Sequence, residues 1–125
     1  MGRGSSKLKG IPYGTEYRTL HQMGNVKFIK PNKGSTTAPD YTETPGRIYA
    51  TIGKKNEVKF ITFYGSDGKR SKQIDVSGIA HRVNGKKIIP HVHLGLHSDK
   101  AYKPSKKERR QIALIVREWY NFNNR

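Results

Sequence analysis

Apolar and polar residues alternate in several short runs along this chain, and a period of two residues is typical of a half-buried β-strand. Glycine, proline, serine and asparagine separate the runs, and these residues favour turns. Five strands are predicted in this way, at residues 26–30, 47–52, 57–64, 69–76 and 88–97. The run at 57–64 has apolar residues on both faces, so it should be a central strand.

The connections between the runs carry signals of their own. Gly65 to Gly68 should form a turn, and the Asn84-Gly85 pair is the strongest hairpin signal in the sequence. Residues 31–46 hold three prolines and predict a long loop, and loops of that length are often functional or mobile. Pro90 lacks an amide donor, so the strand beside it should lie at an edge of the sheet or bulge there.

The C-terminal segment has the pattern of an amphipathic helix. Ser105 and Glu108 form a capping box after Pro104. The helix should run from Ser105 to about Asn121 and cover one face of the sheet, which leaves the opposite face open. Its apolar stripe, expected to be buried against the sheet, consists of Ile112, Ile115, Val116 and Trp119.

Residues 1–24 are interpreted as a flexible basic leader. Within it, Tyr13, Tyr17 and Leu20 are spaced i, i+4, i+7, which favours a short helix from about Thr15 to Met23. Residues 25–125 should then form a single domain. The predicted fold class is α+β, with a sheet of four to six antiparallel strands and a C-terminal helix on one face.

The charge of the chain indicates a polyanionic partner. Among 125 residues there are 25 Lys and Arg against 9 Asp and Glu, a formal net charge of +16. Nucleic acid is the first candidate and an anionic membrane surface the second. The absence of cysteine excludes disulfides and thiolate metal sites. No apolar run of about 18 residues occurs, so no membrane span is expected.

The histidines stand out within this basic chain. In an extended strand His91, His93 and His97 would share one face, while Val92, Leu94 and Leu96 would face the core. Two histidines side by side on an open sheet face suit a site that binds phosphate and moves protons. The other interpretation is an edge strand whose histidines are merely solvated.

Metal-independent RNA cleavage fits these residues best. It needs a base for the 2′-hydroxyl proton, an acid for the leaving 5′-oxygen and a cation for the phosphorane charge. The candidate catalytic residues are His91, His93, His81 and Arg70. The candidate RNA-binding residues are Lys69, Lys72, Arg82, Lys86, Lys87, His97 and Tyr64, the last as an aromatic hydroxyl that stacks on a base or donates to phosphate.

A metal site is the weaker alternative. The histidines could supply imidazole ligands, but carboxylates are few and Asp99 is the nearest in sequence. The strongly positive field also repels divalent cations. Neither a metal nor another cofactor is therefore expected.

One stretch of the sequence is similar to a known group of nucleases. The run Phe-Tyr-Gly-Ser-Asp-Gly-Lys-Arg-Ser-Lys-Gln-Ile-Asp-Val, followed by a histidine and then Pro-His-Val-His, resembles the C-terminal nuclease domains of bacterial polymorphic toxins and phage head-associated proteins. These belong to the barnase-, EndoU-, colicin- and RelE-like (BECR) ribonucleases. The resemblance covers about residues 57–97 and implies a curved antiparallel sheet, a packed helix and metal-independent RNA cleavage.

The resemblance also implies a biological setting. Residues 25–125 would be a nuclease-like toxin effector domain that acts on RNA, with tRNA among the candidates, in the bacterial cytoplasm after secretion or delivery within a larger chain. An acidic immunity protein would occupy its basic groove. Catalytic residues vary within the group, so the resemblance implies a site near His91, His93, Lys69 and Arg70 without fixed roles. The common layout of the group places the helix first, and the predicted helix after the sheet departs from it. The alternative from another class is a non-catalytic nucleic-acid-binding module of a phage or ribosome-associated protein.

Overall fold

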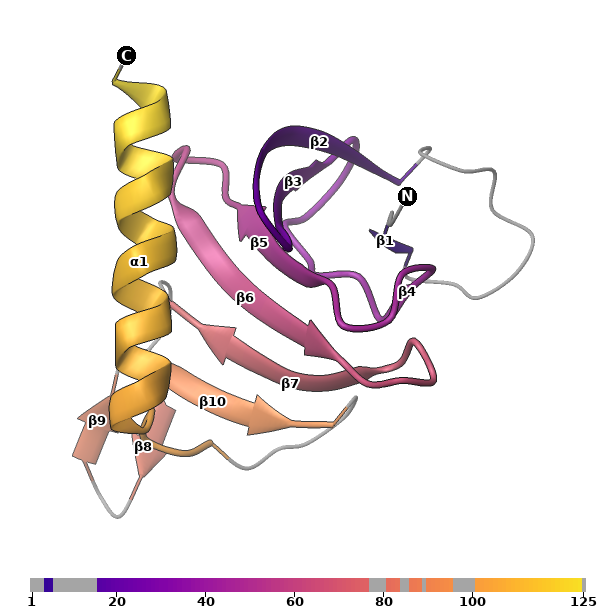
Figure 1. Ribbon diagram of the computed structural model, residues 1–125. Helices are drawn as coiled ribbons and strands as arrows, with labels where there is room; N and C mark the ends of the chain where they lie inside the picture. Colours follow the sequence, from indigo (N-terminus) through magenta and orange to yellow (C-terminus); the bar gives the residue numbers. More distant parts are fainter. Residues whose placement is uncertain are drawn as a thin grey trace.

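An open sheet of six strands forms the centre of the computed structural model, which describes residues 4–5, 16–76, 81–83, 86–88, 90–95 and 101–124. For 4–5, 81–83 and 86–88 only the backbone is described. The strands, in the order in which they lie side by side, are β10 (His91–Leu94), β7 (Arg70–Asp75), β6 (Val58–Tyr64), β5 (Ile48–Ile52), β3 (Val26–Pro31) and β2 (Tyr17–Met23). The sheet curves strongly from one edge to the other (Figure 1).

Two further strand pairs and one helix complete the described fold, which is α+β as predicted. Strand β1 (Gly4–Ser5) pairs with β4 (Tyr41–Thr42), and β8 (His81–Val83) pairs with β9 (Lys86–Ile88). Tyr102 also forms an isolated bridge to Val92. Helix α1 (Lys106–Asn123) lies along one side of the sheet (Figure 1). No helix in the described parts of the chain is long and apolar enough to cross a membrane.

Most of the predicted strands are confirmed, and two of them occupy the predicted positions in the sheet. Strand β6 lies inside the sheet, and β10 lies at its edge, as Pro90 indicated. The pairing of β8 with β9 confirms the hairpin, although Asn84 and Gly85 themselves lie outside the described residues. The sheet is mixed and not wholly antiparallel, because β3 and β5 run parallel. The segment at 32–47, which includes β4, makes the crossover that a parallel pair requires.

The predicted helix from Thr15 to Met23 is wrong, because Tyr17–Met23 forms strand β2. This strand pairs antiparallel with β3 through a tight turn in which Gly24 has φ 55°. Tyr17 and Leu20 are three residues apart, and strand residues separated by an odd number of positions point to opposite faces. Tyr17 packs on one side of the sheet and Leu20 on the other, so their helical spacing does not form one stripe.

The helix at the C-terminus is confirmed together with its cap. The Ser105 hydroxyl accepts from the Glu108 amide at 3.1 Å, and the Glu108 carboxylate accepts from the Ser105 amide at 2.8 Å. Ile115 and Trp119 are buried, and Ile112 is half-buried against the same core. Val116 is exposed, contrary to prediction. It lies about 100° around the helix from Ile115, which places it on the flank of the buried stripe.

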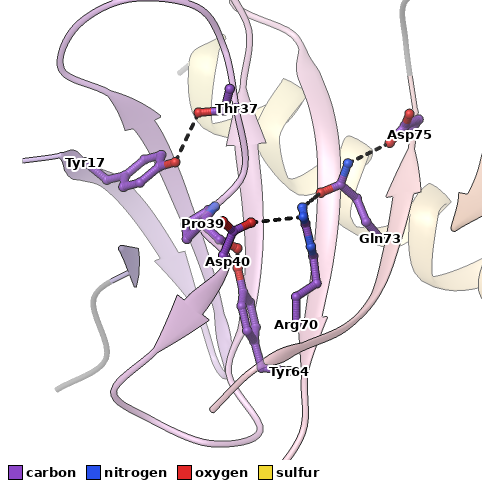
Figure 2. A network of polar contacts seen from close by, with 8 residues as sticks. All are labelled: Tyr17, Thr37, Pro39, Asp40, Tyr64, Arg70, Gln73 and Asp75. Atoms are coloured by element: carbon purple, nitrogen blue, oxygen red, sulfur yellow. Dashed lines mark hydrogen bonds and ion pairs between the residues drawn. The ribbon is translucent and has the colours of Figure 1, made fainter. Parts of the chain in front are cut away.

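Each face of the sheet has its own core. The helix side holds the larger one, formed by Val26, Phe28, Ala50, Ile52, Val58, Ile61, Ile74, Val92, Ile115 and Trp119. The opposite side holds a cluster of Tyr17, Ile29, Tyr49 and Tyr64. That side is not simply open, because the loop around residues 36–40 covers part of it. The Tyr64 hydroxyl donates to the Pro39 carbonyl, and the Tyr17 hydroxyl bonds the Thr37 hydroxyl (Figure 2).

Glu108 links the helix cap to the sheet. Partial burial acts to raise its pKa, but the hydrogen bonds from Lys72 and the Ser105 amide, with the Lys72 charge, outweigh it and hold the pKa below the ordinary value of 4.5. A lowered pKa means that the ionised form favours the folded state. This stabilisation is therefore present above pH 4.5 and is lost as the pH falls through the folded-state pKa.

Removing the cap should weaken the fold measurably. Ser105→Ala should lower the free energy of unfolding by roughly 0.5–2 kcal/mol, because the Glu108 amide loses its acceptor. Urea denaturation at neutral pH measures this. Ser66→Ala, in the exposed turn between β6 and β7, is the control and should change stability by less than about 0.5 kcal/mol. Equal losses in the two variants would contradict a specific role for the cap.

Candidate active site

Two histidines and one carboxylate converge at the edge of the sheet. His91 and Asp75 are directly paired across β10 and β7, so their side chains leave the same face. The Nε2 atom of His91 lies 3.0 Å from Oδ2 of Asp75, and Nε2 of His93 lies 3.6 Å from the same oxygen. Because a carboxylate only accepts, His91 donates this bond. One carboxylate oxygen therefore faces two imidazoles.

The two histidines differ in their access to solvent. Side-chain exposure is 2% for His91 and 16% for His93. The expectation that both rings sit on an open face is wrong for His91, although their shared face is confirmed. Val92 is buried in the helix-side core as predicted, whereas Leu94 is 50% exposed because it lies near the end of the edge strand. His97 and Leu96 lie outside the described residues.

A chain of hydrogen bonds extends the cluster away from the histidines (Figure 2). Gln73 donates from Nε2 to Oδ1 of Asp75 at 2.9 Å. Arg70 donates from Nη1 to Oε1 of Gln73 at 2.5 Å and from Nη2 to Oδ1 of Asp40 at 2.9 Å. Gln73 thus orients Asp75 and Arg70 together. Arg70, a predicted site residue, lies one side chain away from the histidine cluster.

Tyr64 does not act as predicted. Its ring is buried in the cluster with Tyr49, and its hydroxyl is bonded to Pro39. Burial raises the pKa of Tyr64 well above its usual value, with the neighbouring Tyr49 adding to the effect. Burial also raises the pKa of Tyr17. Tyr64 therefore supports the loop around Pro39 and cannot stack on a base.

The predicted cations divide between the two sides of the sheet. Lys69 is exposed at the turn next to Arg70. Lys72 faces the helix side, where it pairs with Glu108 at 2.8 Å and lies over the Phe63 ring, so its predicted place in the site is wrong. Lys72 and Gln73 are adjacent in β7, and adjacent residues of a strand point to opposite faces. Lys72 therefore points away from the face that carries Gln73 and Asp75.

The hairpin candidates stay predictions. The backbones of His81 and Arg82 lie in β8, and those of Lys86 and Lys87 lie in β9. Their side chains lie outside the described part of the structure. This hairpin forms its own two-stranded sheet and does not extend the six-stranded one.

A pocket of about 440 Å³ adjoins the hydrogen-bonded chain. It lies between the loop around residue 38 and strands β6 and β7. Its lining is both polar and apolar, and it consists of Thr36, Thr37, Ala38, Asp40, Phe60, Arg70 and Gln73. Such a concave, mixed surface beside ionisable groups is typical of a ligand site.

The structure adds residues that sequence reasoning missed. Asp75, Gln73 and Asp40 complete the site, and the carboxylate beside the histidines is Asp75 and not Asp99, which lies outside the described residues. Gln73 and Asp75 are two apart on a predicted strand, so their shared face was a usable signal. The length of the loop at 31–46 favours a functional role, but no local pattern singles out Asp40.

The same cluster could hold a metal ion. Asp75, His91 and His93 each offer one ligand atom, and these atoms lie within 4.8 Å of one another. Imidazole and carboxylate are ligands for zinc and other transition metals. The expectation of a metal-free site therefore stays a prediction that a chelation experiment must test.

A scan against protein-family models finds no family that matches the chain, and searches of the curated proteins and of the solved structures find no similar protein. The chemistry available to the site is that of its own side chains. These are two imidazoles on one carboxylate, with a guanidinium held nearby. Such a set can transfer protons and bind an anion.

Proposed function

We propose that this chain is a metal-independent endoribonuclease with its active centre at His93, Asp75 and Arg70. The observation that carries the proposal is the placement of Asp75. One oxygen of Asp75, Oδ2, faces both histidines. The other, Oδ1, accepts a hydrogen bond from Gln73, and Gln73 in turn accepts one from Arg70. A proton-transfer group and a phosphate-binding cation are thereby held on one face of a chain with net charge +16.

The proposed reaction is internal transesterification of RNA. A general base removes the proton of a ribose 2′-hydroxyl, and the 2′-oxygen attacks the adjacent phosphorus. The bond from phosphorus to the 5′-oxygen breaks, and a general acid gives that oxygen a proton. The products are a 2′,3′-cyclic phosphate and a 5′-hydroxyl. DNA lacks the nucleophile, so it should not be cleaved.

His93 is the proposed proton-transfer residue because it is the more accessible imidazole of the pair. Asp75 holds its ring and stabilises the imidazolium that forms during the reaction. His91 contacts the same carboxylate from the buried side, so we assign it as a positioning residue. The second proton-transfer role stays with His81, the remaining histidine among the candidate catalytic residues.

Arg70 is the proposed stabiliser of charge on the phosphorane. Its guanidinium is oriented before substrate arrives, because Asp40 and Gln73 each accept one of its hydrogen bonds. Preorganised donors stabilise developing charge without a reorganisation cost at the moment of reaction. Lys69, exposed beside it, would contribute to phosphate binding.

The setting of the activity is part of the proposal. A free ribonuclease in the bacterial cytoplasm would harm the cell that makes it, so a toxin effector domain needs an inhibitor. An acidic immunity protein is the expected partner, because opposite charge both speeds association with a +16 chain and covers the RNA-binding face.

A turnover experiment tests the proposal. A labelled single-stranded RNA in large excess over the protein, in EDTA, should be cut to fragments that end in 2′,3′-cyclic phosphate, while DNA of the same sequence stays intact. Salt-sensitive binding without cleavage would instead support a non-catalytic nucleic-acid-binding module. Cleavage that stops in EDTA and returns with added zinc would assign a metal to Asp75, His91 and His93.

A further inference from the structure

The pocket beside the proposed active centre contains one aromatic side chain, Phe60. It is half-buried on strand β6 and is the direct cross-strand partner of Asp75. Paired residues of adjacent antiparallel strands hold their β-carbons about 4.5–5.5 Å apart. The Phe60 ring therefore lines the pocket immediately beside the carboxylate that contacts His91 and His93.

Most of the other residues that line the pocket are polar, and two of them hold each other in place. Asp40 and Arg70 pair with each other, and both line the pocket. Thr36 and Thr37 add hydroxyls that can donate or accept. An aromatic surface beside preoriented donors and acceptors matches a planar, heteroaromatic ligand whose edge carries hydrogen-bonding groups.

We propose that this pocket binds a single unstacked nucleobase, from one of the two nucleotides that flank the scissile phosphate, by stacking on Phe60. This inference rests on the proposed ribonuclease function and names its substrate class as single-stranded RNA. A base inside a duplex is paired and stacked, so it cannot enter a pocket of about 440 Å³ without being extruded. Protein recognition of unpaired RNA commonly uses aromatic stacking of splayed bases.

A binding experiment tests the pocket without relying on turnover. The probes are the four nucleoside 5′-monophosphates and ribose 5-phosphate, titrated into the full chain. At least one mononucleotide should bind roughly 5- to 150-fold more tightly than ribose 5-phosphate, the gain that one base–aromatic stack gives. Phe60→Leu should abolish this difference while it leaves ribose 5-phosphate binding unchanged.

Phe63→Leu is the matched control. Phe63 is on the same strand and also half-buried, but it faces the helix side and contacts Lys72. It should retain the preference for the mononucleotide. Equal loss in both variants, or equal affinity of every mononucleotide and ribose 5-phosphate for the parent chain, would overturn the nucleobase pocket.

Cleavage provides a second readout that separates this inference from the proposed function. A single-stranded RNA should be cut at least about 10-fold faster than the same strand annealed to its complement. Equal cutting of both would overturn the inference and leave the ribonuclease proposal standing. Base-dependent, Phe60-dependent binding without any RNA cleavage would overturn the ribonuclease proposal and leave the pocket as a nucleobase-binding site.

Discussion

His93→Ala should lower kcat for RNA cleavage by about two to four orders of magnitude, the effect of removing a general acid or base. The ring is half-buried, its Nε2 lies 3.6 Å from Oδ2 of Asp75, and it is the more exposed imidazole of the pair. Initial rates on a labelled RNA in EDTA, at saturating substrate, measure this. Circular dichroism should show that the variant remains folded.

His21→Ala is a closely matched control for this substitution. His21 is also 16% exposed and also contacts a carboxylate, with its Nε2 2.7 Å from Oε2 of Glu118. It lies on the helix side of the sheet, where its ring stacks on Phe122. Its loss should reduce stability and leave kcat of the folded protein unchanged. Equal losses of kcat in the two variants would remove His93 from the proposed active centre.

His91→Ala should behave differently from either variant. Its ring is almost fully buried against Asp75, so the substitution should weaken the fold as well as the site. The substitution leaves a cavity and removes a partner of a half-buried carboxylate, and both changes destabilise the fold. The loss of kcat should be smaller than in His93→Ala, since Asp75 is still held by Gln73.

Trp119→Ala should lower the free energy of unfolding by about 3–5 kcal/mol, which is typical of a large aromatic side chain lost from a core. Trp119 joins the helix to the sheet in two ways. Its ring stacks on Phe28 with centroids 5.5 Å apart, and its indole N–H donates to the carbonyl of Asn56 at 2.8 Å. The variant therefore loses apolar burial and leaves a carbonyl without this donor.

Urea denaturation measures this loss, with Tyr120→Ala as the control. Tyr120 is the next residue of the same helix and is 65% exposed, so its substitution should change stability by less than about 0.5 kcal/mol. A Trp119→Ala protein as stable as the Tyr120→Ala protein would contradict the packing of α1 on the sheet.

The sequence by itself determined the parts of the fold that depend on near neighbours. The capping box at Ser105 and Glu108 is a contact between residues three apart, so the start of the helix could be read directly. The hairpin of β8 and β9 and the edge position of β10 followed from Asn84-Gly85 and Pro90 for the same reason. The helix predicted from Thr15 to Met23 is wrong because Tyr17–Met23 pairs with β3 as a strand, and the spacing of its apolar residues does not reveal that pairing.

Only the tertiary structure decided the composition of the candidate site. Its members come from distant positions, since Asp75 meets His91 across 16 residues and Asp40 meets Arg70 across 30. Strand alternation correctly placed His91 and His93 on one face, but it could not specify the register of β10 against β7 that brings Asp75 to them. Register and burial depend on pairing and packing over the whole sheet, so a local sequence pattern predicts neither of them.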